Sequence, residues 1–218
     1  MKIDKGTANS SPFVGVFIAL TENVALVPSS ILPKEEQKLK KTFDVEIIKA
    51  KLSDSSLLGV LCSGIGDKFV VSELALDSEV EHLESIGLKI KRIEGTTAIG
   101  NLIRANSKGG IASMALTKEQ LSSIEAFFGI KFYQTKVASL DIVGSCTIAS
   151  DRGFVVNPNV KQKEFEILKK AFGTDGIACT MNYGDRFVGN SAIMNSKAML
   201  LGDRTTTYEI LRIHDFFG

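Results

Sequence analysis

The chain has 218 residues, of which 44% are hydrophobic and 23% charged, and this composition excludes a disordered tail protein or a collagen-like chain. Lys and Arg total 26 against 25 Asp and Glu, so no strongly basic field exists to hold nucleic acid by counterion release alone. Three cysteines, Cys62, Cys146 and Cys179, are too few for a disulfide framework, and His82 and His214 are the only histidines. We therefore expect no metal site and no cofactor.

The first long apolar run, from Pro12 to Leu20, is too short to span a membrane. Lys2 and Lys5 precede it, as in a signal peptide, but an internal repeat explains the run better. The sequence is typical of a soluble, cytoplasmic protein without a membrane partner.

An apolar residue followed by glycine recurs along the chain and opens an apolar run each time. The glycines are spaced 44, 41, 44 and 45 residues apart. The five pairs are Val14-Gly15, Leu58-Gly59, Ile99-Gly100, Val143-Gly144 and Val188-Gly189. This spacing predicts five structural repeats.

Each glycine is followed by an apolar run, a polar turn and a second apolar run, which is the pattern of a β-hairpin. We expect the first strand of each hairpin to begin directly after the glycine. These first strands are predicted at Val16–Leu20, Val60–Cys62, Asn101–Ala105, Ser145–Ala149 and Asn190–Met194.

A helix and a third strand follow each hairpin. Apolar residues at helical spacing, as at Leu121, Ile124 and Phe128, indicate the helices. Two signals indicate where the helices start. One is a proline at the first helical position, as at Pro33, and the other is a serine or threonine three residues before a glutamate or glutamine. These capping boxes are predicted at Ser78/Glu81, Thr117/Gln120 and Thr206/Glu209.

The fifth repeat stops after its helix at Gly218, where its third strand would begin. An open gap in a ring would expose a sheet edge, so we expect residues 2–10 to supply the missing strand. The prediction is a single domain over residues 1–218, with repeats at about 15–58, 59–99, 100–143, 144–188 and 189–218.

Several segments resemble the translation initiation factor 6 family, whose fold is the pentein β/α-propeller, an α+β ring of five strand-strand-helix-strand repeats. The matching segments are Ala98–Asn101, Asp141–Ser145 and Gly202–Glu209. Asn157-Pro158 stands where the family usually has His-Pro. The chain ends at its last helix without the tail of eukaryotic members, so it resembles the archaeal form.

The resemblance implies a monomeric protein that binds the large (50S) ribosomal subunit and prevents its association with the small (30S) subunit. The implied contacts are ribosomal protein L14 and, at the rim, rRNA of the sarcin-ricin loop region. Matching the family residue by residue assigns ribosome binding to Gly100 and Asn101. The residues at equivalent points of other repeats, Val60, Ser145 and Asn190, are further candidates.

Two alternatives stay open from the sequence. Other penteins modify guanidino groups with a cysteine nucleophile, a histidine and carboxylates. Here Cys62 and Cys146 lie among apolar neighbours, and no motif brings His82 or His214 to a thiol, so we predict no enzyme and no small-molecule substrate. The second alternative is a propeller scaffold that binds an unrelated protein.

Overall fold

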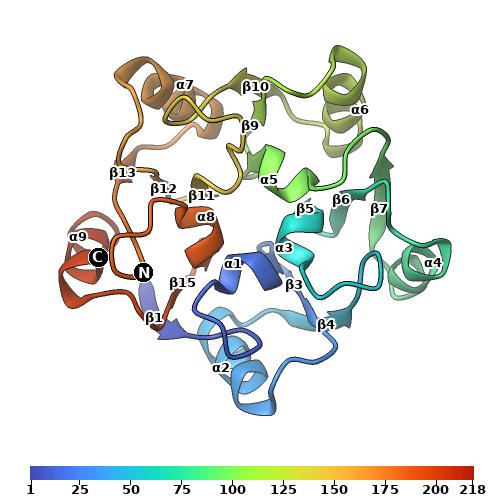
Figure 1. Cartoon of the computed structure of the whole chain (residues 1–218), viewed down its shortest axis with the longest axis horizontal. Coiled ribbons are helices and arrows are strands. Elements are labelled where there is room, and N and C mark those ends of the chain that lie inside the picture. The colour runs from blue at the N-terminus through green and yellow to red at the C-terminus, as the bar shows by residue number, and fades with distance from the viewer.

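Five similar units, here called blades, surround one axis in the computed structural model, which describes residues 1–218 (Figure 1). Each blade holds one three-stranded sheet, in which the middle strand is antiparallel to the first and parallel to the third. A long helix on the outer rim follows the middle strand of each blade, and in four blades it leads to the third strand (Figure 1). The predicted α+β pentein-type propeller is confirmed.

The first three blades begin with a single helical turn at the axis. The first blade contains α1 (Val14–Phe17), β2 (Ala19–Leu20), β3 (Val24–Pro28), α2 (Pro33–Phe43) and β4 (Glu46–Ala50). The second contains α3 (Leu58–Leu61), β5 (Cys62–Ile65), β6 (Lys68–Ser72), α4 (Asp77–Ser85) and β7 (Lys89–Ile93). The third contains α5 (Ile99–Leu102), β8 (Ile103–Ala105), β9 (Gly110–Ser113), α6 (Lys118–Phe128) and β10 (Phe132–Thr135).

The last two blades vary this plan slightly. The fourth opens with a turn at residues 143–146, followed by β11 (Thr147–Ser150), β12 (Gly153–Val156), α7 (Gln162–Phe172) and β13 (Gly176–Ala178). The fifth contains α8 (Val188–Ser191), β14 (Ala192–Met194), β15 (Ala198–Gly202) and α9 (Thr207–Phe217), and its third strand is β1 (Lys2–Gly6).

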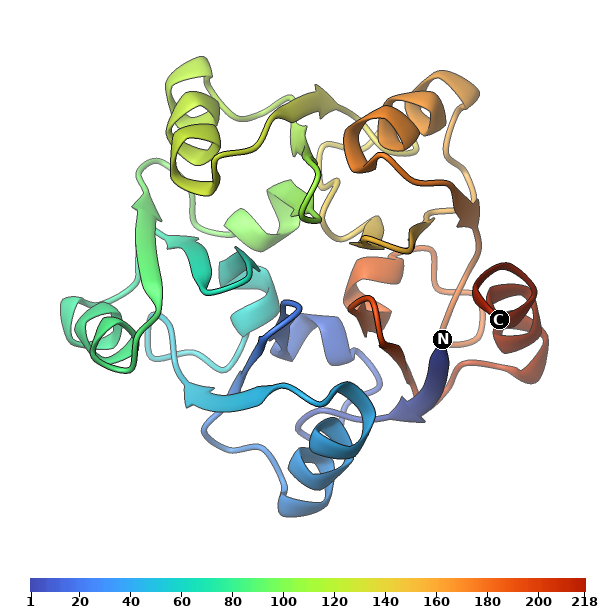
Figure 2. The ribbon, with the colours of Figure 1, turned by 180° about the vertical axis from the view of Figure 1, so that it is seen from behind.

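The two ends of the chain meet in the fifth blade. Strand β1 pairs in parallel with β15, from Lys2 beside Ala198 to Gly6 beside Gly202. The amino group of Met1 donates a hydrogen bond to the carbonyl oxygen of Phe217 at 3.1 Å. Both termini therefore lie side by side, and the ring has no open blade (Figure 2).

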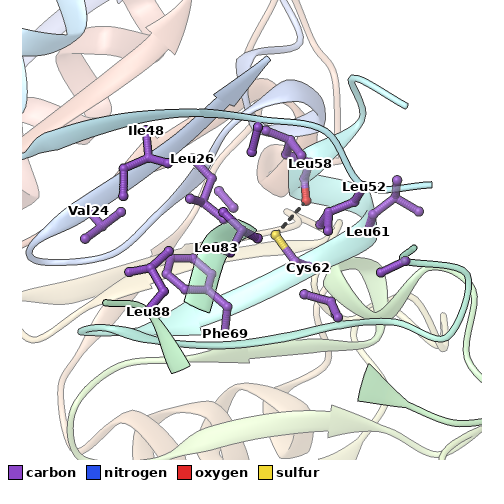
Figure 3. Packing of buried hydrophobic residues seen from close by; sticks show 14 residues of the cluster. Val24, Leu26, Ile48, Leu52, Leu58, Leu61, Cys62, Phe69, Leu83 and Leu88 are labelled. Carbon is purple, nitrogen blue, oxygen red and sulfur yellow. Dashed lines mark hydrogen bonds between the residues drawn. The ribbon is translucent and has the colours of Figure 1, made fainter. Parts of the chain in front are cut away.

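The hydrophobic core is divided into five clusters, and each cluster lies between two adjacent blades. Between the first and second blades, Leu26 and Ile48 pack against Leu58, Phe69 and Leu83 (Figure 3). Burying one such side chain contributes about 1.5–3 kcal/mol. Because every cluster contains side chains from two blades, the blades stabilise one another.

The five repeat glycines form a closed ring of backbone contacts at the axis, here called the axial ring. A Cβ atom at any of them would overlap the carbonyl oxygen of the preceding ring glycine. The pairs, with the glycine that would carry the Cβ first, are Gly15 and Gly189, Gly59 and Gly15, Gly100 and Gly59, Gly144 and Gly100, and Gly189 and Gly144. Only a residue without a side chain fits this spacing.

The predicted first strands begin too early, and this part of the prediction is wrong. The residues directly after the ring glycine complete a helical turn in four blades and a turn in the fourth. The strands start three to four residues after the glycine, at Ala19, Cys62, Ile103, Thr147 and Ala192. Apolar segments such as Val14–Phe17 have strand propensity, but the contacts of the axial ring require the chain to turn there.

Two of the three predicted capping boxes are confirmed. The amides of Thr117 and Thr206 donate to the side chains of Gln120 and Glu209, and the threonine hydroxyls accept the return bonds. Pro33 is the first residue of α2, as predicted.

The predicted Ser78/Glu81 box is wrong, because α4 begins two residues earlier. The Glu79 carboxylate accepts the amide hydrogen of Leu76 at 2.9 Å. A leucine before the helix gives no capping signal in the sequence, and Ser78 lies inside the first turn.

Substitution of a ring glycine by alanine tests the axial ring. We expect Gly100→Ala to lower the free energy of unfolding by about 3 kcal/mol or more, because its Cβ has only rigid backbone oxygens to displace. Urea unfolding measures the change. Gly66→Ala is the matched control, since Gly66 has φ of +59° but open space around it, and a left-handed alanine costs about 1–2 kcal/mol. If Gly100→Ala lowered the free energy of unfolding by less than Gly66→Ala, the close packing of the axial ring would be contradicted.

Candidate functional site

The five predicted site residues lie together around the axis, in the turns that carry the axial ring. Gly100 and Ser145 are buried, whereas Val60, Asn101 and Asn190 are half-buried. Gly100 and Ser145 therefore support the ring, and the other three residues present side-chain atoms to solvent.

Hydrogen bonds join these residues across blade boundaries. The hydroxyl of Ser145 donates to Oδ1 of Asn101 at 2.9 Å. The amide of Gly144 donates to the Asn101 carbonyl oxygen, and the amide of Gly189 donates to the Ser145 carbonyl oxygen, both at 2.8 Å. The turns of the third, fourth and fifth blades are thus fixed relative to one another before any partner binds.

Exposed apolar side chains surround these turns. Phe13, Leu57 and Ile142 each lie two residues before a ring glycine, and they are 40%, 38% and 36% exposed. Their equivalent places in the repeat put them on one face of the ring, here called the ring face. Exposed apolar groups gathered on one face are typical of a protein contact. The prediction from sequence missed them, although an apolar residue stands at this place in every repeat.

The opposite face carries the turns between the first and second strands and is here called the hairpin face. Each first strand runs from the axial ring to this turn, and the middle strand returns. The outer helices therefore begin on the side of the ring face. The loops between blades also lie on this side.

A carboxylate at the third position of four outer helices holds the loop between blades. The Glu35 side chain accepts hydrogen bonds from the amides of Asn9 and Ser10 at 3.0 and 2.9 Å and from the Thr7 hydroxyl at 2.6 Å. Asn9 and Ser10 both have left-handed backbones. Successive amides in such a turn point the same way and form a cradle for an anion. We call this arrangement the loop latch.

The loop latch recurs with small changes. Glu79 binds the amides of Ser53 and Asp54, Glu164 those of Ala138 and Ser139, and Glu209 those of Tyr183 and Gly184. In the third blade, Nε2 of Gln120 instead donates to the carbonyl oxygen of Glu94 at 2.7 Å. All five loops next to the ring face are thereby tied to an outer helix.

The three thiols have no catalytic setting. All three are buried, and burial raises the pKa of Cys62 to about 12 and that of Cys146 to about 11. The Cys62 thiol donates to the carbonyl oxygen of Leu58 at 3.1 Å, inside the core between two blades (Figure 3). His82 and His214 are exposed on the outer helices α4 and α9, so no histidine lies beside a thiol.

No group of three or more potential metal-ligating side chains occurs in the structure. None of the helices combines the length and apolar character needed to cross a membrane.

Comparison with known proteins identifies a family over nearly the whole chain. The sequence profile of the eIF-6 family matches residues 3–216. Translation initiation factor 6 of Thermococcus onnurineus is 31% identical over 225 residues, covering 100% of this chain and 99% of its own. The factor of Staphylothermus marinus is 30% identical, covering 98% and 96%. That of Methanobrevibacter smithii is 31% identical, covering 95% and 94%.

Among solved structures, the agmatine deiminase of C. jejuni aligns with a TM-score of 0.41 and 17% identity. The alignment covers 57% of this chain and 50% of that enzyme.

The loop latch predicts a pH dependence of stability. Burial raises the pKa of Glu35, but hydrogen bonds from Thr7, Ser10, Leu32 and Asn9 outweigh it, and the net pKa is below the ordinary 4.5. Its contribution is therefore complete above the unfolded pKa and is lost as the pH falls through the lowered folded pKa. We expect Glu35→Gln to cost about 1–3 kcal/mol at pH 7 and progressively less below about pH 4.5.

Urea unfolding between pH 7 and pH 3 measures this difference. Glu81→Gln is the control, because Glu81 is exposed and has no hydrogen bond to its side chain. The latch would be contradicted if both variants lost the same free energy of unfolding. It would also be contradicted if the loss caused by Glu35→Gln became larger as the pH falls.

Proposed function

The protein belongs to the eIF-6 family of translation initiation factors, and we propose that it binds the large (50S) ribosomal subunit and prevents association with the small (30S) subunit. Support comes from full-length relatives that are named as translation initiation factors and not as enzymes. The observation that carries the proposal is the ring face itself, which joins exposed apolar groups to a rigid, hydrogen-bonded centre.

The proposed contact lies around the axis. Asn101 supplies an amide group, and Val60 and Asn190 add side-chain atoms beside it. Gly100 and Ser145 fix the backbone beneath these side chains. A net charge of +1 fits docking on a protein better than docking on many phosphates. The proposed protein contact is ribosomal protein L14, with rRNA of the sarcin-ricin loop region at the rim.

Occlusion requires no chemistry from the protein. One surface of the large subunit is occupied, and the small subunit is excluded as long as the complex persists. A pre-organised surface favours this role, because little conformational freedom is lost when it binds. The latches and the axial ring provide that rigidity. The proposal includes a cytoplasmic monomer as the active form.

Co-sedimentation with separated ribosomal subunits tests the proposal. We expect stoichiometric binding to the large subunit, none to the small subunit, and fewer joined ribosomes when both are mixed. Absence of binding to the large subunit would overturn the proposal and leave a scaffold for an unrelated protein. Binding without any effect on joining would overturn the occlusion mechanism.

Asn101→Arg tests the proposed contact. A long charged side chain at the centre of the face should weaken binding to the large subunit at least tenfold, which corresponds to about 1.4 kcal/mol. The lost hydrogen bond from Ser145 lowers the melting temperature by only a few degrees, roughly the effect of 1 kcal/mol in a domain of this size.

Ser122→Arg is the matched control, because it adds the same charge at an exposed place on the outer helix α6. Unchanged binding by Asn101→Arg, or equal weakening by the control, would remove Asn101 from the contact.

A further inference from the structure

A cavity follows the axis on the inner side of the hairpin face. An inner part of about 30 Å³ lies against ring glycines, and an outer part of about 190 Å³ leads to the hairpin turns. Both parts share lining residues from all five blades: Leu20, Gly64, Ala105, Ala149 and Met194. The inner part has room for roughly two waters or one small charged group.

One cation faces this otherwise uncharged inner cavity. Arg104 lies in β8, four residues after its ring glycine. The equivalent residues of the other blades are Ala19, Ser63, Ile148 and Ile193. The five-fold pattern therefore breaks at a single place, where a small or apolar residue is replaced by a guanidinium.

The guanidinium of Arg104 lacks a counter-charge in the protein. It forms no ion pair, and its one hydrogen bond runs from Nη2 to the carbonyl oxygen of Gly144 at 2.9 Å. Its Nε atom is out of contact with solvent and has no partner. Burial lowers the pKa of Arg104 to about 10, so the group still carries its charge at neutral pH.

Glu22 is the one acid that lines either part of the cavity, and it already has partners in the protein. Both oxygens of Glu22 accept hydrogen bonds from Ser196, at 2.8 and 2.6 Å. Asp151 likewise accepts two hydrogen bonds from Ser107, at 3.0 and 2.8 Å. A partly buried charge without compensation is costly, and the Nη1 atom of Arg104, which has no hydrogen-bond partner and is not closed off from solvent, can donate to an oxyanion. The compensating charge is therefore expected from a ligand.

We propose that the axial cavity binds a small monocarboxylate, whose carboxylate pairs with Arg104 and whose short apolar body lies in the outer cavity. The outer wall is formed largely by apolar groups, among them Leu20, Ile65 and Met194, while amide and hydroxyl groups such as those of Asn106 and Ser150 stand at its edge. This composition fits a carboxylate with a few carbons better than phosphate, which has no apolar part. The ligand enters from the hairpin face, so the proposed ribosome contact on the ring face stays free.

Fluorine NMR with trifluoroacetate as the probe tests this site on the full chain. We expect saturable binding of one trifluoroacetate per protein, displaced by butyrate at lower concentration than by chloride or phosphate. Arg104→Met should weaken probe binding at least tenfold. Arg104→Lys, which keeps the charge but not the fork of donors, should weaken it several-fold and serves if the methionine variant does not fold.

Arg152→Gln is the matched control, because Arg152 is exposed in a turn of the hairpin face and its loss removes the same charge. This variant should bind the probe as the parent protein does. Equal binding by the parent and both Arg104 variants, or no saturable binding to the parent, would overturn the site. Displacement by chloride as effectively as by butyrate would overturn the carboxylate class.

Discussion

The contact between five glycines at the axis is the constraint on which the rest of the structure depends. Each glycine approaches the carbonyl oxygen of a neighbour so closely that no side chain fits, and the contacts close into a ring. The blades must then stand at equal intervals around the axis. Their inner strands extend away from the ring, and the apolar faces of adjacent sheets meet to form the five core clusters.

The same constraint separates the two faces of the molecule. On the ring face, helical turns, latched loops and exposed apolar groups form a surface whose backbone is fixed by hydrogen bonds such as that between Ser145 and Asn101. On the hairpin face, short turns surround a cavity that leads to Arg104. A rigid contact surface and an axial ligand site can thus coexist in one small ring, because they open in opposite directions.

Much of the fold was predictable because the same sequence pattern occurs five times along the chain. Glycine spacing, apolar runs and the Thr117 and Thr206 caps indicated the order of elements. The turns at the axis were not predictable, since their apolar residues favour a strand until contacts between distant glycines impose a turn. The repeat spacing placed Asn101 directly after a ring glycine, and the family resemblance assigned its role. By contrast, the exposure of Phe13 and the isolation of Arg104 depend on neighbours that are remote in sequence.

The proposed function requires that the ring face is the surface that binds the large ribosomal subunit. Cryo-electron microscopy of the protein bound to purified large subunits tests it most directly. We expect density for a five-bladed ring whose turns around Asn101 lie against a ribosomal protein. The hairpin face should be directed to solvent and overlap the place of the small subunit. Attachment through the hairpin face or the outer helices would contradict it.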